Sequence, residues 1–137
     1  MAPIVTDEIC IQIKSERDIV AARQDGRKLA AQVGFSGVDL TLIATAISEM
    51  ARNIAVYAGE GEIVLDAIQD GSRRGIMVIA RDEGPGIPNL ERAMQDGFST
   101  GQSLGLGLPG ARRLMDELEV SSRVGKGTSV TMKKWKR

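Results

Sequence analysis

The sequence predicts a two-layer α/β sandwich, in which helices cover one face of a mixed β-sheet. Three observations support this fold class. Strand-like and helix-like segments follow one another in the order β, α, α, β, β, short α, α, β, β, which suits helices packed on one sheet. The length of 137 residues indicates a single domain over 1–137. Because hydrophobic residues make up 42% and aromatic residues only 3%, we expect an aliphatic core.

The N-terminal part is predicted to form one strand and two helices. Residues 9–13 alternate between isoleucine and other side chains, as on a half-buried strand. Ser15 precedes acidic residues and is a plausible N-cap for a helix that runs through about Gln32 and stops at Gly34. A second helix begins near Asp39. Its apolar residues recur at steps of three and four: Leu40, Ile43, Ile47, Met50 and Ile54.

A hairpin is predicted to follow the second helix, which ends at Gly59 and Gly61. Residues 62–69 and 76–81 are apolar enough for strands, and the polar, glycine-containing stretch 70–75 between them is typical of a turn. The two strands therefore form a β-hairpin.

The C-terminal part is predicted to contain a short helix over 90–96, a loop over 97–107 rich in Gly, Ser and Thr, and a third helix. Pro109 suits the first turn of that helix, which is expected to run through about Glu117. A strand, a turn and a second strand then occupy 119–123, 124–127 and 128–133.

The composition excludes several kinds of active site. The chain has no histidine, which removes Ser-His-Asp and Cys-His nucleophiles, histidine metal sites and a phosphohistidine within the chain. Cys10 is the single cysteine, so no disulfide framework exists. Zero formal net charge argues against nucleic acid as the partner. With no secretory signal and no apolar run long enough to span a membrane, a cytoplasmic location is expected.

The first candidate functional pair is Glu49 and Asn53. Their spacing of four residues places them on one helix face, beside the apolar stripe of the second predicted helix. A carboxylate and an amide oxygen at the edge of the core can hold Mg²⁺ and orient a hydroxyl. The alternative is a solvated glutamate with an incidental asparagine.

The second candidate is the stretch 82–87, Asp-Glu-Gly-Pro-Gly-Ile. Glycines allow a ligand to approach the backbone closely, and Asp82 at a strand end can accept a hydrogen bond from an exocyclic amino group such as that of adenine. The alternative is an ordinary turn after a strand.

Two further glycine-rich stretches are candidates. Residues 101–110 run into a helix, and their backbone N–H groups and the helix N-terminus can cradle phosphate. No strand precedes the G-x-G-x-x-G match at 105–110, which excludes a dinucleotide fingerprint. In residues 125–128, Gly-Lys-Gly-Thr, the lysine is followed by Gly127, where a phosphate-binding P-loop has Ser or Thr. The alternatives are a flexible connector and a hairpin turn.

Together, these stretches resemble the GHKL (Bergerat-fold) ATPases, which include gyrase-type ATPases, Hsp90 chaperones, MutL and histidine kinases. The matching boxes occur in the family's order across nearly the whole chain: Glu49-x-x-x-Asn53, Asp82-x-Gly84-x-Gly86-Ile87, Gly105-Leu106-Gly107 and Gly125-Lys126-Gly127-Thr128. The stretches 46–53, 83–88, 96–100 and 107–117 look closer to the small anti-sigma-factor-type serine kinases, and closest to the switch kinases of the bacterial stressosome.

The resemblance implies phosphoryl transfer from ATP with Mg²⁺. Glu49 would be the general base that activates a protein serine or threonine hydroxyl, and Asn53 would coordinate Mg²⁺ bridging the ATP phosphates. The lid around the phosphates would contain Gly105, Leu106 and Gly107. Asp82 would bind the adenine amino group, with Thr128 on the adenine side. The remaining residues of the adenine box would be Gly84, Gly86 and Ile87.

The resemblance also implies protein partners. A histidine kinase needs a phosphoacceptor histidine, and the chain has none, so the phosphoryl acceptor is expected to be another protein. Such kinases phosphorylate STAS-domain antagonist proteins (RsbS-like and RsbR-like) and, once released, bind and activate a PP2C-type phosphatase (RsbU-like). Two other functions stay open: a module that activates the phosphatase by docking alone, and an anti-sigma factor that binds a sigma factor directly.

Overall fold

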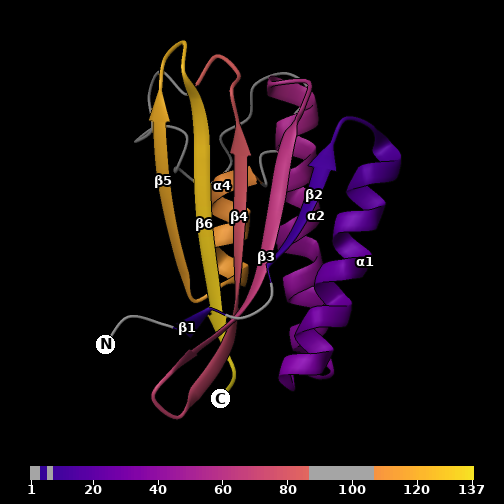
Figure 1. Ribbon diagram of the computed structural model, residues 1–137, viewed down its shortest axis with the longest axis vertical. Helices are drawn as coiled ribbons and strands as arrows, with labels where there is room; N and C mark the ends of the chain where they lie inside the picture. The colour runs from indigo at the N-terminus through magenta and orange to yellow at the C-terminus, as the bar shows by residue number, and fades with distance from the viewer. Residues whose placement is uncertain (1–3, 6–7, 87–106) are drawn as a thin grey trace.

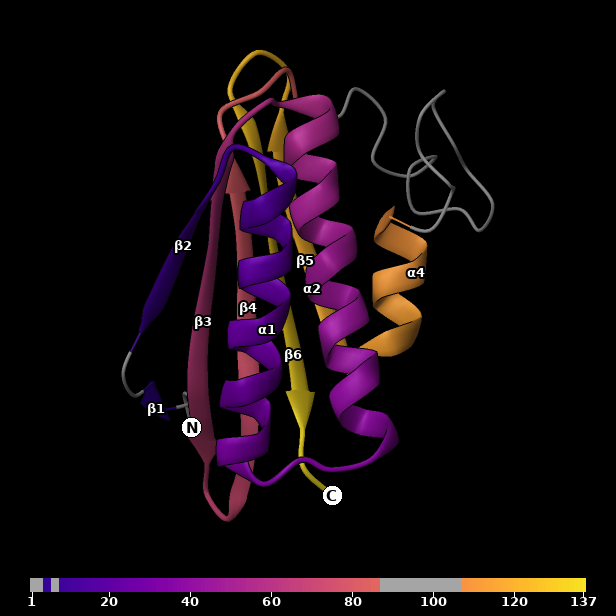
Figure 2. The same ribbon diagram turned by 90° about the vertical axis from the view of Figure 1, so that its right-hand side faces the viewer.

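The molecule consists of one β-sheet and three helices in the part of the chain that its computed structural model describes, residues 4–5, 8–86 and 107–137. All of these helices lie on the same face of the sheet (Figures 1 and 2), which confirms the two-layer α/β sandwich. The strands are β1 (Ile4–Val5), β2 (Ile9–Ile13), β3 (Gly61–Asp70), β4 (Arg73–Asp82), β5 (Glu117–Arg123) and β6 (Gly127–Trp135). The helices are α1 (Glu16–Val33), α2 (Val38–Tyr57) and α4 (Gly107–Leu114). None of them is long and apolar enough to cross a membrane.

The sheet is antiparallel, where the sequence suggested a mixed one. Its order is β1-β3-β4-β6-β5, with β2 paired to β3, and every pairing among the described strands is antiparallel. Two successive helices follow β2 and bring the chain back to the end of the sheet at which β2 stops. Strand β3 starts there, so β2 and β3 run in opposite directions. The strands β4 and β5, joined across α4, run in the same direction, but β6 lies between them.

The boundaries of α1 match the prediction. Ser15 is the N-cap in extended conformation, although its hydroxyl makes no capping bond. Instead, the Asp18 carboxylate in the first turn accepts bonds from the Lys14 N–H at 2.9 Å and from the Ser15 hydroxyl at 3.3 Å. Gly34 ends the helix with φ of 120°, a conformation that favours glycine.

The core is aliphatic, as the composition predicted. It lies between the helices and the inner face of the sheet, and its central members are fully buried: Ile13, Ile43, Ile47, Met50, Ile54, Ile63, Leu65, Ile76, Val78 and Met132. The apolar stripe of α2 supplies many of these side chains. This burial fixes the rotation of α2 about its axis, and so determines where its polar residues point.

The largest differences from the predicted element boundaries occur at the start of β4 and between α4 and β5. Strand β4 begins at Arg73, because the β3–β4 turn contains only residues 71 and 72. Helix α4 ends at Leu114 and β5 begins at Glu117. The Asp116 N–H donates to the Lys133 carbonyl at 2.9 Å, and the Asp116 carboxylate accepts from the Trp135 N–H at 2.7 Å. These contacts with β6 draw the chain out of the helix and into the sheet.

Candidate nucleotide-binding site

Helix α2 carries the first two candidate residues. Glu49 and Asn53 are both half-buried, one helical turn apart. The next residue after each of them, Met50 and Ile54, is almost fully buried. Since neighbouring positions on a helix differ by about 100°, the two polar side chains lie at the border of the core, as predicted.

The second candidate residue, Asp82, ends β4 and is half-buried. Its Oδ1 accepts a hydrogen bond from the Gly84 N–H at 2.9 Å, which closes a tight turn within the segment. Gly84 in turn lies against the end of α2, because a Cβ built on it would be 2.6 Å from the Cβ of Ala58. The structure thus brings Asp82 to the same end of the molecule as Asn53, and leaves space only for glycine at position 84.

The turn after β4 packs against the β5–β6 hairpin, backbone to backbone. The Gly125 N–H donates to the Pro85 carbonyl at 2.9 Å. Gly86 has φ of 80°, and a Cβ on it would overlap the Arg123 carbonyl. Gly127 has φ of 114°, and a Cβ there would overlap the carbonyl of Asp82. These glycines let the turns approach each other closely.

Thr128 lies directly beside Asp82. The two residues are paired across β4 and β6, and Ser122 is paired with Thr128 across β5 and β6. The Ser122 and Thr128 hydroxyl oxygens are 2.9 Å apart, and the Ser122 hydroxyl donates to the Gly127 carbonyl at 3.2 Å. Side chains alternate along a strand, so these three residues face the helix layer with the core residues two positions away: Ala80, Val120 and Val130.

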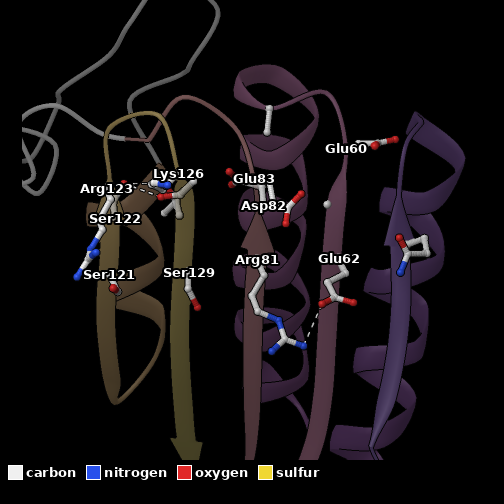
Figure 3. Close-up of a pocket in the computed structure, with 15 residues that line it drawn as sticks. Glu60, Glu62, Arg81, Asp82, Glu83, Ser121, Ser122, Arg123, Lys126 and Ser129 are labelled. Atoms are coloured by element: carbon white, nitrogen blue, oxygen red, sulfur yellow. Dashed lines mark hydrogen bonds and ion pairs between the residues drawn. The ribbon is translucent and has the colours of Figure 1, made fainter.

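A cleft of about 850 Å³ lies at this end of the sheet (Figure 3). Its lining includes Asp82, Ser122 and Thr128 from the row described above, together with the cations Arg123 and Lys126. Neither of the α2 candidates lines it. Its lining also includes Glu62, Arg81 and Ser129, whose side chains point away from the helices, so the cleft opens on the end and the outer face of the sheet. The adenine-side candidates lie at its rim, whereas the two α2 candidates lie in the helix layer.

The outer wall of the cleft contains a hydrogen-bonded acid. Arg81 forms an ion pair with Glu62 at 3.0 Å, and the Cys10 thiol donates to the Glu62 carboxylate at 2.9 Å. This thiol bond lowers the pKa of Glu62 and raises the pKa of Cys10. The hydrogen bond therefore favours the protonated form of the thiol.

Some predicted residues lie outside the described part of the chain. These are Ile87, Gly105 and Leu106, together with the short helix expected over 90–96. Gly107 is described as the first residue of α4. That helix packs beside α2, which carries Glu49 and Asn53.

Sequence reasoning missed two residues of this site, Ser122 and Ala58. Ser122 would have been found by pairing the strands about a turn of residues 124–126, as observed, whereas the predicted 124–127 turn sets Arg123 opposite Thr128. Ala58 offered no such signal. Its contact with Gly84 depends on how α2 is placed on the sheet, which a local pattern does not specify.

We expect Gly127→Ala to destabilise the protein more than Gly125→Ala. Both glycines have positive φ, which costs alanine about 1 kcal/mol. Nothing lies within 4 Å of a Cβ at Gly125, whereas a Cβ at Gly127 meets the backbone of Asp82. This overlap should add about 1–3 kcal/mol to the loss of unfolding free energy. Urea unfolding of both variants measures the difference, and equal losses would contradict the close packing of the two turns.

Solved structures share this architecture. The chain superimposes on the sensor histidine kinase MprB of mycobacteria with a TM-score of 0.56 and 20% identity, covering 96% of this chain and 99% of that one. The catalytic domain of histidine kinase ThkA gives a TM-score of 0.56 with 16% identity and the same coverage. The chain therefore has the α/β fold of histidine kinase catalytic domains.

Sequence comparison gives the family. The model of the histidine kinase-like ATPase domain matches residues 14–134, and the chain belongs to this family. It is 50% identical over 133 residues to the serine/threonine-protein kinase RsbT of Bacillus subtilis (strain 168), covering 97% of this chain and all of that protein. It is 38% identical over 125 residues to the anti-sigma F factor of Thermoanaerobacter sp. (strain X514), covering 87% of this chain and 82% of that protein.

Proposed function

We propose that the chain is a single-domain protein serine/threonine kinase, which transfers the γ-phosphoryl group of ATP to a hydroxyl of a partner protein. The observation that carries the proposal is the position of Asp82. Its carboxylate is held at the end of β4, beside Thr128, by the N–H of Gly84, and Gly84 itself lies against the end of α2. The 50% identity to a protein named as a serine/threonine-protein kinase supports the same reaction.

Adenine recognition is assigned to the residues paired at the end of the sheet, Asp82 and Thr128. One oxygen of the Asp82 carboxylate is used by the Gly84 N–H, and the second can accept from the exocyclic amine of adenine. Gly84 and Gly86 keep the wall free of side chains where the ring would lie. Thr128 provides a hydroxyl beside the carboxylate, and Ile87 completes the set of residues that we assign to the ring.

The phosphates are assigned to the helix layer. Gly105, Leu106 and Gly107 precede or open α4, so their N–H groups and the helix N-terminus suit phosphate oxygens. Asn53 would hold Mg²⁺ through its amide oxygen. The described residues contain no cluster of three acidic or thiol ligands, which fits a magnesium ion that keeps waters and binds nucleotide phosphates. When bound, Mg²⁺ neutralises charge on the phosphates.

Glu49 is assigned as the general base. It lies one turn before Asn53 on the same face of α2, so its carboxylate can face a hydroxyl presented at the phosphate end. The carboxylate takes the hydroxyl proton while the hydroxyl oxygen bonds to the γ-phosphorus and the bond to the ADP oxygen breaks. The acceptor hydroxyl is proposed to belong to another protein, and the chain has no histidine that could take the phosphoryl group instead.

The proposed partners are STAS-domain proteins of the stressosome, of the RsbS-like and RsbR-like type, as phosphoryl acceptors. A PP2C-type, RsbU-like phosphatase is the proposed partner of the released kinase, in a cytoplasmic stress-signalling switch. The names of the two relatives, a serine/threonine-protein kinase and an anti-sigma factor, support a partner-switching role. An anti-sigma factor that binds a sigma factor directly is the second candidate, favoured by the 38% identity to the anti-sigma F factor.

Radiolabelled ATP with purified partners tests the proposal. We expect label on a serine or threonine of a STAS-domain protein, dependent on both this chain and Mg²⁺. A sigma factor captured by the tagged chain in the presence of ATP, with no label on any STAS protein, would favour the second candidate. Absence of both label and ATP binding would overturn the proposed kinase.

A further inference from the structure

We propose that the free edge of β5 is an interaction surface, at which the strand pairs antiparallel with β5 of a second copy of this chain. The pairing would join the two sheets into one continuous sheet in a reversible dimer. This inference goes beyond the proposed kinase reaction and does not depend on it, because it concerns the edge of the sheet and not the nucleotide site.

Strand β5 ends the sheet. It pairs with β6 on one side, and no described strand pairs with its other side. Its seven residues contain neither proline nor glycine, so nothing in the strand interrupts main-chain pairing. The opposite edge is divided between two shorter strands, since β1 has two residues and β2 has five. Unpaired N–H and C=O groups on an edge are a template for another strand, and β5 offers the longer template.

The charges of β5 match a second copy of the same strand. Side chains alternate along a strand, so the exposed residues of β5 share the outer face of the sheet: Glu117, Glu119, Ser121 and Arg123. Antiparallel pairing centred on Val120 sets Glu117 of each copy opposite Arg123 of the other copy. The same pairing sets Glu119 opposite Ser121, so each carboxylate faces a donor and no like charges meet.

Other registers of the two strands fit less well. Pairing centred on Glu119 sets the two Glu119 carboxylates opposite each other, which is unfavourable. A shift by one residue sets exposed side chains opposite Leu118 and Val120, which pack against the core. Pairing centred on Ser121 joins only residues 119–123, whereas pairing centred on Val120 joins all seven residues. The sequence of β5 therefore favours the register centred on Val120.

The two charged side chains are placed for this contact. One oxygen of the Glu117 carboxylate accepts from the Trp135 indole N–H at 2.6 Å, which orients the carboxylate and leaves its second oxygen for a guanidinium. Figure 3 shows the Arg123 side chain on the side of β5 away from β6, at the free edge. In such a dimer the main-chain hydrogen bonds supply most of the affinity, and the ion pairs determine the register and the partner.

Sedimentation velocity of the full chain without nucleotide, from about 5 μM to about 500 μM, tests the proposal. We expect a monomer–dimer equilibrium with a dissociation constant on the order of 10–100 μM, because one strand pairing gives a small interface. Arg123→Glu and Glu117→Arg should each weaken self-association at least about tenfold, since each sets like charges opposite each other. Lys28→Glu, the same charge reversal at an exposed position of α1, should leave self-association unchanged.

A mixture of the two β5 variants gives the sharpest result. In an equimolar mixture of Arg123→Glu and Glu117→Arg, every charge pair between the two chains joins opposite charges. The mixture should therefore dimerise to within about threefold of the unmodified chain, although neither variant does so alone. The double variant with both reversals exchanges the two charges and should also dimerise. Thermal unfolding of each variant verifies that the protein being sedimented is folded.

Three outcomes would overturn the proposal. The first is an unmodified chain that stays monomeric at about 500 μM, which would leave the free edge to a strand of a different protein. The second is a dimer that persists in both single variants, because the contact then lies on another surface. The third is a mixture of folded variants that fails to associate. None of these outcomes affects the proposed kinase, which is tested with ATP and a partner protein.

Discussion

Asp82→Asn is expected to weaken ATP binding about 100-fold. Asparagine keeps an oxygen that can accept from the Gly84 N–H, so the turn after β4 should retain its shape. The second carboxylate oxygen becomes an NH₂ group, which meets the 6-amino group of adenine donor to donor. The loss therefore comes from one mismatched and desolvated pair within an otherwise unchanged site.

Calorimetric titration with ATP measures this effect, and Glu83→Gln is the matched control. Glu83 follows Asp82 directly, is exposed, and loses the same charge on substitution. The affinity of Glu83→Gln for ATP should stay within about threefold of that of the unmodified chain, because surface charges contribute little to binding free energy. Equal losses in the two variants would mean that charge, and not hydrogen bonding to adenine, accounts for the effect.

Glu49→Gln is expected to slow phosphoryl transfer about 100-fold to 10,000-fold while leaving ATP affinity within about threefold. Glutamine fills the same half-buried volume on α2 but cannot take a proton from the attacking hydroxyl. The defect should appear in the chemical step, since Glu49 does not line the cleft that contains Asp82 and Thr128.

Single-turnover transfer from radiolabelled ATP to a STAS-domain protein separates the chemical step from binding. Glu119→Gln provides the control, because Glu119 is an exposed glutamate on β5 that does not line the cleft. Transfer by Glu49→Gln at the unmodified rate would exclude Glu49 as the base. Loss of ATP binding in this variant would instead assign Glu49 to the nucleotide site.

Local patterns were enough to predict most elements. The isoleucine alternation predicted β2, and the three- and four-residue spacing of the α2 stripe predicted both the helix and its buried face. The edge position of Glu49 and Asn53 followed from that stripe, because burial of the apolar side chains fixes the rotation of the helix. The half-buried position of both side chains confirms this reasoning.

Local sequence patterns did not predict the features that depend on pairing between strands far apart in the chain. The insertion of β6 between β4 and β5 made the sheet antiparallel, and a single segment contains no information about that order. Glycine within 70–75 suggested a longer turn, but Gly75 lies in β4 against the backbone and ring of Trp135, sixty residues away in the chain. Helix α4 ends before the predicted residue for the same reason, since hydrogen bonds between Asp116 and β6 take the chain out of the helix.

The contact between Gly84 and Ala58 joins the last turn of the helix layer to the end of the sheet. A nucleotide that touches both Asn53 and Asp82 would tie the two layers together and bind only the folded chain. Its binding free energy then adds to the free energy of unfolding, by about 2.7 kcal/mol when the ligand is present at 100 times its dissociation constant. The fraction of this protein that is folded, and therefore able to bind a partner protein, would then rise with the nucleotide concentration around it.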